Sequence, residues 1–223
     1  MYKSDLHCHT IDVSKCADLA LEEMIENYIK YGYSTMVITD HFSSATFEDK
    51  HSLTWSEKCD FYVSGYKRAK EIANGRITVI LGMEYRNIYT ANDYLVYGVT
   101  EEFLKKHNKS DEDNTLNMHL KDFCEIVHEN GMLIYQAHPF RNGIKVVNPQ
   151  YLHGIETQNT HPRIDSRNDI AALWAKKFNL PGIAGSDCHK KQDAGTSAIL
   201  TEYKIEKIED LLYILKNNLY KIL

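Results

Sequence analysis

Short apolar strands alternate with amphipathic helices along this chain, and the alternation restricts the folds open to it. One helical face carries Leu21, Met24, Ile25, Tyr28 and Ile29, and a strand-like run follows at 35–39. Repeated strand–helix units are typical of a parallel sheet, which at 223 residues fits a barrel or a doubly wound sheet. We therefore expect an α/β protein in which residues 1–223 form a single domain.

The same pattern locates further elements. Strands are predicted at 77–81, 132–136 and 181–184, with a weaker strand pair within 88–99. Helices are predicted at 120–127, 170–178 and 208–215. The stretch 47–58 has no clear period and follows a strand, so we expect a long loop there. In both candidate folds the functional site lies at the carboxyl ends of the strands.

Charge and composition disfavour several classes of function. The formal net charge of −5 provides no overall basic field, which disfavours a long nucleic acid as partner. No apolar run reaches the roughly 18 residues of a membrane-spanning helix. Five cysteines without a disulfide-type spacing, and a start that lacks a signal-peptide pattern, indicate a cytoplasmic protein. The sequence leaves the oligomeric state open.

Metal-ligand residue types follow nearly every predicted strand. They are His7, His9, Asp40, His41, Glu84, His138, Glu156, Asn159, His161, Asp187 and His189. In a strand, residues two apart point to the same side, so the two histidines of "HCHT" can converge on one ion. Imidazole nitrogens mixed with carboxylate oxygens suit zinc, manganese or iron. The other five histidines are more typical of structural residues: His51, His107, His119, His128 and His153.

Five short motifs stand in order between residues 5 and 189: "HCHT", "TDH", "GME", "AHP" and "GSDCH". This series resembles the PHP superfamily, named for its polymerase and histidinol phosphatase members. The resemblance implies a distorted (β/α) barrel of about seven strands with two or three divalent metal ions. It also implies a metal-dependent phosphoesterase that works by a metal-activated hydroxide. Because the sequence has no basic patch, we expect the substrate to be a small phosphomonoester.

Carried over by position, the resemblance implies three ion sites. His7, His9, Glu84 and Asp187 would hold the first ion. Glu84 would bridge to a second ion held also by His138. His41 and His189 would hold the third.

Two departures from the family pattern affect these assignments. The chain reads "SKC" where many members carry a further ligand, so Cys16 could bind the third ion as a thiolate, or an aspartate of this loop could reach it. Alternatively, Cys16 is a packing residue and the third site is weak or empty. After Glu156, either Asn159 or His161 could complete the second site, and we favour His161.

Two further residues are candidates for catalysis. Arg141 directly follows "AHPF", where its guanidinium could bind phosphate, although a salt bridge at the barrel rim would also explain it. Asp40 could orient a ligand histidine or transfer a proton.

Other functions remain open. A phosphodiesterase or exonuclease acting on nucleotides or short oligonucleotides would use the same chemistry. A non-catalytic metal-binding regulatory module would use the same ligands. An amidohydrolase-like C–N hydrolase is less favoured because no lysine stands at the relevant strand ends.

Overall fold

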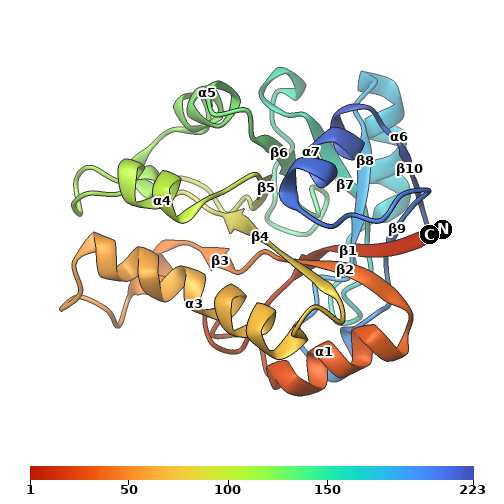
Figure 1. Ribbon diagram of the computed structural model, residues 1–223. Coiled ribbons are helices and arrows are strands. Elements are labelled where there is room, and N and C mark those ends of the chain that lie inside the picture. Colours follow the sequence, from red (N-terminus) through yellow and green to blue (C-terminus); the bar gives the residue numbers. More distant parts are fainter.

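A ten-stranded sheet curls into a nearly closed barrel in the computed structural model, which describes residues 1–223 (Figure 1). The barrel wall is built from β1 (Tyr2–Cys8), β2 (Tyr33–Ile38), β4 (Thr78–Tyr85), β5 (Tyr94–Tyr97), β6 (Leu133–Gln136), β7 (Gly154–Asn159) and β8 (Gly182–Gly185), which neighbour one another in that order. The wall closes where Cys188, just beyond β8, forms a parallel bridge with Cys8 at the end of β1. The expected distorted barrel of about seven strands is confirmed.

Three short strands lie outside this wall. β3 (His41–Phe42) pairs with the end of β4, and so carries the chain along the rim of the barrel. β9 (Ile199–Thr201) and β10 (Tyr220–Ile222) form an antiparallel extension beside β1. The sequence did not reveal β9 or β10, because strands of three residues are too short to establish a period.

Helices are present at all four predicted positions, and three further helices, at 44–47, 55–73 and 101–107, were not predicted. In chain order, the helices are α1 (Leu21–Lys30), α2 (Ser44–Phe47), α3 (Trp55–Ala73), α4 (Glu101–His107), α5 (Leu120–Glu129), α6 (Asn168–Phe178) and α7 (Ile208–Lys216). In α1 four of the five apolar residues of the predicted face are buried and Ile29 is partly buried, and Gly32 beyond the helix end adopts a φ of 76°. None of the helices combines the length and apolar character needed to cross a bilayer.

The prediction of a loop over 47–58 is wrong at both ends of this stretch, because each end is helical. Phe47 closes α2, and α3 already begins at Trp55. Thr54 accepts a hydrogen bond from the backbone N–H of Glu57, while the Glu57 side chain accepts one from the backbone N–H of Thr54. This capping box is encoded as Thr-x-x-Glu, a helix-start signal in the sequence that outweighs the poor apolar period of the first turn.

β5 departs from a simple repeat of parallel units. It runs antiparallel to both β4 and β6, so only six strands of the wall share one direction. A parallel connection needs a crossover of a dozen or more residues, whereas only the short segment 86–93 separates β4 from β5. The chain therefore returns as a long hairpin, which is the distortion of this barrel.

The interior of the barrel contains a buried apolar cluster. Leu6, Val37, Leu95 and Ile183 from four wall strands pack there with Leu211 of α7. Full burial of each such side chain contributes about 1.5–3 kcal/mol. This packing fixes the strands, whose carboxyl ends carry the polar residues of the site.

Candidate metal centre

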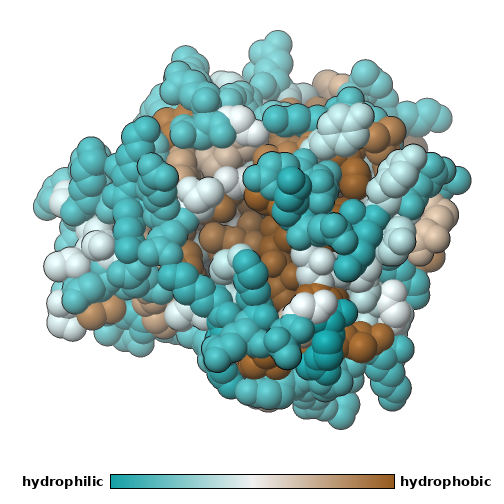
Figure 2. Space-filling model, in the orientation of Figure 1, coloured by the Kyte–Doolittle hydropathy of each residue, from teal (hydrophilic) through white to brown (hydrophobic).

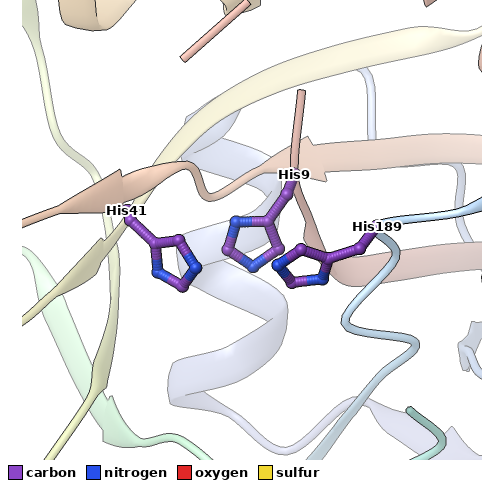
Figure 3. A group of neighbouring side chains, drawn as sticks. All are labelled: His9, His41 and His189. Carbon is purple, nitrogen blue, oxygen red and sulfur yellow. The ribbon is translucent and has the colours of Figure 1, made fainter. Parts of the chain in front are cut away.

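The rings of His9, His41 and His189 face one another at the carboxyl ends of the strands (Figure 3). They come from the end of β1, from β3 and from the segment after β8, which are far apart in the sequence. The ring centroids of His9 and His189 are 4.1 Å apart, and those of His9 and His41 are 4.4 Å apart. The convergence predicted for these three histidines is thus present in the fold.

Glu84, at the end of β4, lies at the centre of a larger group. Its carboxylate oxygens are 3.3 Å from Nε2 of both His7 and His9. The same carboxylate is 2.7 Å from His41 Nδ1 and 3.0 Å from His138 Nε2. One buried carboxylate therefore faces four imidazoles, as a bridging ligand would.

The tautomers of His7 and His9 are set by acceptors behind them. His7 Nδ1 donates to Glu156 Oε1 at 2.9 Å. His9 Nδ1 donates to Ser14 Oγ at 3.1 Å, because the Ser14 hydroxyl itself donates to Asp40 at 2.7 Å. In both rings Nε2 is therefore the nitrogen left to bind an ion, and it points into the site. Acceptors of this kind commonly orient metal-ligating histidines.

Asp187, from the segment after β8, completes the group. Its Oδ1 is 3.3 Å from His9 Nε2 and 3.5 Å from His7 Nε2, and Arg141 donates to its Oδ2 at 2.7 Å. Asp187 and His138 both have positive φ values, 54° and 29°. Left-handed backbone is strained for residues other than glycine, and such strain is concentrated at functional sites.

The charges in this group indicate a site that attracts cations. Burial alone would raise the pKa of Glu84, yet the charges on His7 and His41 hold that pKa well below its ordinary value. Burial would lower the pKa of His7, but Asp187, Glu156 and Glu84 raise it well above 6.5. For His9, burial together with His189 and His41 holds the pKa well below 6.5, so its ring is neutral.

Polar atoms without partners support a metal site. The Nε2 atoms of His7 and His9, Nδ1 of His138 and Oε2 of Glu84 are buried without a hydrogen-bond partner. An unsatisfied buried polar group costs about 1–3 kcal/mol, so four in one place require an explanation. A divalent ion would satisfy ligands of this kind, and the donor set of imidazoles and carboxylates fits zinc, manganese or iron.

Cys16 lies beside His41 and His189 at the opening of the site, and it is exposed to solvent. Burial of the sulfur raises the pKa of Cys16, but hydrogen bonds with His189 and His41 outweigh this effect and bring the pKa to about 6. The thiolate form that binds metals is therefore accessible near neutral pH. Its role as a ligand stays a prediction.

A pocket of about 290 Å³ opens onto these side chains. The cationic residues that line it are Arg86, Arg141, Arg163 and Lys190. Two of the arginines are held by carboxylates at two points each: Arg86 by Asp93 at 2.6 Å and Arg163 by Asp193 at 2.7 Å. The pocket is thus lined mainly by cationic and metal-ligand side chains.

Asp40 lies behind the site, away from the pocket. Its carboxylate accepts hydrogen bonds of 2.7 Å from the backbone N–H and the hydroxyl of Thr10, as well as from Ser14. Burial raises the pKa of Asp40 to about 6, although these hydrogen bonds oppose the shift. The geometry connects Asp40 to His9 through Ser14.

Asn159 and His161, the two candidate ligands after Glu156, both lie outside the groups of side chains whose ligand atoms are close together. His161 lines the pocket, but its Nε2 is 3.0 Å from Arg163 Nη2. Asn159 instead accepts from Arg141 through Oδ1 at 2.6 Å and donates to Glu156 at 2.9 Å. The choice between these two residues as a ligand stays a prediction.

Sequence reasoning missed one acidic residue of the site, Asp93, and gave no role to another, Glu156. Asp93 forms a group with Glu84 and His138 in which the ligand atoms lie within 4.8 Å of one another. Glu156 contacts His7 with one oxygen and the backbone N–H of His138 with the other, at 2.9 Å each. Asp93 precedes β5, a strand whose direction was not foreseen, so its approach to the site could not be predicted.

Comparisons with known proteins agree with this geometry. A family model described as PHP-associated matches residues 165–218. An uncharacterised protein of Methanocaldococcus jannaschii is 28% identical over 221 residues, which cover 94% of this chain and 75% of the relative.

Solved structures share the fold at low identity. A two-domain protein of Bacteroides vulgatus, containing a predicted PHP-like metal-dependent phosphoesterase, matches with a TM-score of 0.67 at 16% identity. The match covers all of this chain but only 64% of that one. The lesion-specific Endonuclease Q of Pyrococcus furiosus matches with a TM-score of 0.63 at 16% identity, over 99% of this chain and 57% of that one. An Endonuclease Q complex with a 27-mer duplex substrate gives a TM-score of 0.65 at 16% identity, over 97% of this chain and 56% of that one.

The matched segment 165–218 includes the "GSDCH" motif, and the barrel brings the other four motifs to the same end of the sheet. The PHP-associated family match over residues 165–218, the fold shared with a PHP-like protein and the ordered motifs agree with the resemblance to the PHP superfamily.

Proposed function

We propose that this protein is a metal-dependent phosphoesterase that hydrolyses small phosphomonoesters. The observation that carries the proposal is the buried Glu84 carboxylate, which faces four imidazole nitrogens at 2.7–3.3 Å. A carboxylate can bridge two ions, and sites with two or more ions are typical of enzymes that hydrolyse phosphate esters. Residues 1–223 would act as one catalytic unit.

Each ion would have its own ligands. His7, His9, Glu84 and Asp187 would hold the first ion, and Glu84 with His138 the second, where Asp93 is also within reach. His41 and His189 would hold the third, with Cys16 as the added ligand. His161 would have to leave Arg163 before it could bind the second ion. When bound, the divalent ions would supply Lewis acidity and an activated water.

Arg141 is suited to bind the phosphoryl group. Its Nε donates to Ser166, and its Nη2 donates to Asn159 and Asp187. These contacts fix the guanidinium plane at the pocket while Nη1 makes no hydrogen bond to the protein. A held guanidinium with a free edge can donate to phosphate oxygens and stabilise the charge of the transition state.

Asp40 would act as a positioning residue. Because it holds Ser14, which in turn accepts from His9, it keeps the bare Nε2 of His9 directed at the ion site. Its carboxylate does not line the pocket, so an orienting role is better supported than proton transfer to the substrate.

The test combines elemental analysis with two artificial substrates. Protein purified without chelators or metal-affinity resin should hold two or three ions per chain. It should hydrolyse p-nitrophenyl phosphate faster than bis(p-nitrophenyl) phosphate. Glu84→Gln should lose ions and activity together. Metal-loaded protein that cleaves neither ester would refute the proposal and favour a non-catalytic metal-binding module.

A second candidate is a phosphodiesterase acting on nucleic acid. The structural likeness to Endonuclease Q, which binds a duplex DNA substrate, weakens our expectation that a long nucleic acid is not a partner. Faster cleavage of the diester, or nicking of a duplex, would select this candidate.

The pocket of about 290 Å³ still favours a small ester over a polymer. The five thiols are free, which agrees with our proposal of a reducing, cytoplasmic environment.

A further inference from the structure

The barrel wall is open between the first half of β4 and the strand that follows it in the sheet. β4 pairs with β2 along residues 78–81, but its ladder with β5 begins only at Gly82, opposite Tyr97. Gly98 then adopts a φ of 99° and leads the chain away into α4. No strand therefore covers the β5 side of Thr78–Leu81.

A groove of about 520 Å³ lies over this opening. Its walls are α3, the start of α4 and the start of α7. Figure 2 shows hydrophobic residues at the bottom of a hollow in this region, with hydrophilic residues around it. The apolar lining includes Val63, Tyr66, Val79, Leu81 and Ile208. Leu81 remains partly exposed although it belongs to a central strand. The volume is typical of a site for a small molecule, about 300–1,000 Å³.

Lysines dominate the rim of this groove. Lys67 pairs with Glu101 at 2.6 Å and so connects α3 to α4 across one end. Lys70 contacts only the hydroxyl of Tyr66, at 3.3 Å, and has no carboxylate partner. Lys207 also lines the groove without an ion pair, because the neighbouring Glu206, which lines the groove too, pairs with Lys204 at 3.8 Å. An apolar floor beside two uncompensated cations is complementary to a ligand with an apolar body and one anionic group.

The groove is separate from the metal centre. β4 contributes Leu81 to the groove, whereas it contributes Glu84, three residues later, to the ligand group. No residue lines both the groove and the pocket at the metal centre. We propose that the groove is a second binding site of this protein, and that its ligand is a small amphipathic anion such as a carboxylate with an apolar chain.

The experiment titrates the full chain with sodium decanoate, below its micelle concentration, in an isothermal calorimeter. One decanoate should bind per chain, and hexanoate should bind at least tenfold more weakly, since each buried methylene changes affinity about fourfold. Decylamine has the same apolar chain with a positive charge and should bind at least tenfold more weakly than decanoate, because the rim lysines repel it.

Paired charge reversals locate the site. Lys70→Glu with Lys207→Glu should weaken decanoate binding about tenfold, because both cations become anions at the rim. Lys176→Glu with Lys177→Glu makes the same change in net charge on the exposed face of α6 and should leave the affinity unchanged. Both pairs concern exposed lysines, so the fold is retained.

Three results would overturn the proposal. They are the absence of saturable decanoate binding by the parent protein, equal affinity for decanoate and decylamine, and equal loss of binding in the two double variants. The first would favour a peptide that adds a strand to the open edge of β4. Calorimetry reports binding without any catalytic step, so the outcome does not depend on the proposed phosphoesterase activity.

Discussion

Glu156→Gln should weaken metal binding although Glu156 is not itself placed among the ion ligands. The carboxylate makes three contacts of 2.9 Å: Oε1 accepts from His7, and Oε2 accepts from the backbone N–H of His138 and from Asn159. Glutamine has the same shape but one of its two positions becomes a donor. The substitution therefore tests hydrogen-bond polarity with little change in volume.

Either orientation of the new amide disrupts the site. If the amide oxygen stays near His7, the NH₂ group faces two donors, and both contacts are lost. If the amide is reversed, the NH₂ group faces His7 Nδ1, which must then accept, so the ring proton moves to Nε2. That nitrogen faces Glu84 and Asp187 and could no longer bind an ion.

The expected loss is about 10–100-fold in metal affinity, the usual effect of removing a group that orients a ligand. This corresponds to about 1.4–2.7 kcal/mol. Competition with a chromophoric chelator measures the affinity, and thermal unfolding establishes that the variant is folded. Glu202→Gln, the same change at an exposed position, is the matched control. A Glu156→Gln protein with metal affinity within threefold of the parent would refute the proposed tautomer control.

Three further predictions concern separate parts of the molecule. Arg141→Ala should lower kcat/KM for a phosphomonoester by about 10–1,000-fold with unchanged metal content; unchanged kinetics would contradict its phosphate role. Gly65→Ala should destabilise the fold by about 1–2 kcal/mol in denaturant titration, because the new Cβ would lie 2.2 Å from Thr10 Oγ1, a clash that exceeds the usual helix gain. Burial, together with His128 and Lys216, lowers the pKa of His153 to about 4 in the folded protein. Between pH 4 and pH 6.5, therefore, His153 binds a proton in the unfolded chain but not in the folded one. The parent should lose stability as the pH falls through this window, and His153→Asn should reduce the loss by about 1 kcal/mol, after allowance for solvent exposure; equal pH dependence of unfolding in both proteins would disprove the assignment.

The strand-end residues could be predicted because one rule connects sequence to position. The carboxyl ends of parallel strands meet at one edge of the sheet, so His7, Glu84, His138 and Asp187 had to lie near one another once β1, β4, β6 and β8 were recognised. The order of these strands did not need to be known. The presence of a joint site therefore followed from local patterns alone.

Other features depended on information that periodicity does not contain. The start of α3 is determined by the hydrogen bonds of Thr54 and Glu57, which override the irregular spacing of apolar residues. Asp93 reaches Glu84 only because β5 is antiparallel, and that direction follows from the short connection after β4. The exact contacts of His161 and Asn159 depend on Arg141 and Arg163, whose side-chain positions are set by tertiary packing.

The bridge between Cys8 and Cys188 determines when this site can form. The backbone N–H of His9 donates to the carbonyl of Cys188 at 3.0 Å, so the first ligands are aligned by residues near the other end of the chain. During synthesis the nascent protein cannot complete the ligand group until Asp187 and His189 have left the ribosome. Pairing across such a long loop is slow relative to local helix formation. Metal loading is therefore expected to be a late event in the maturation of this protein, after the rest of the barrel has assembled.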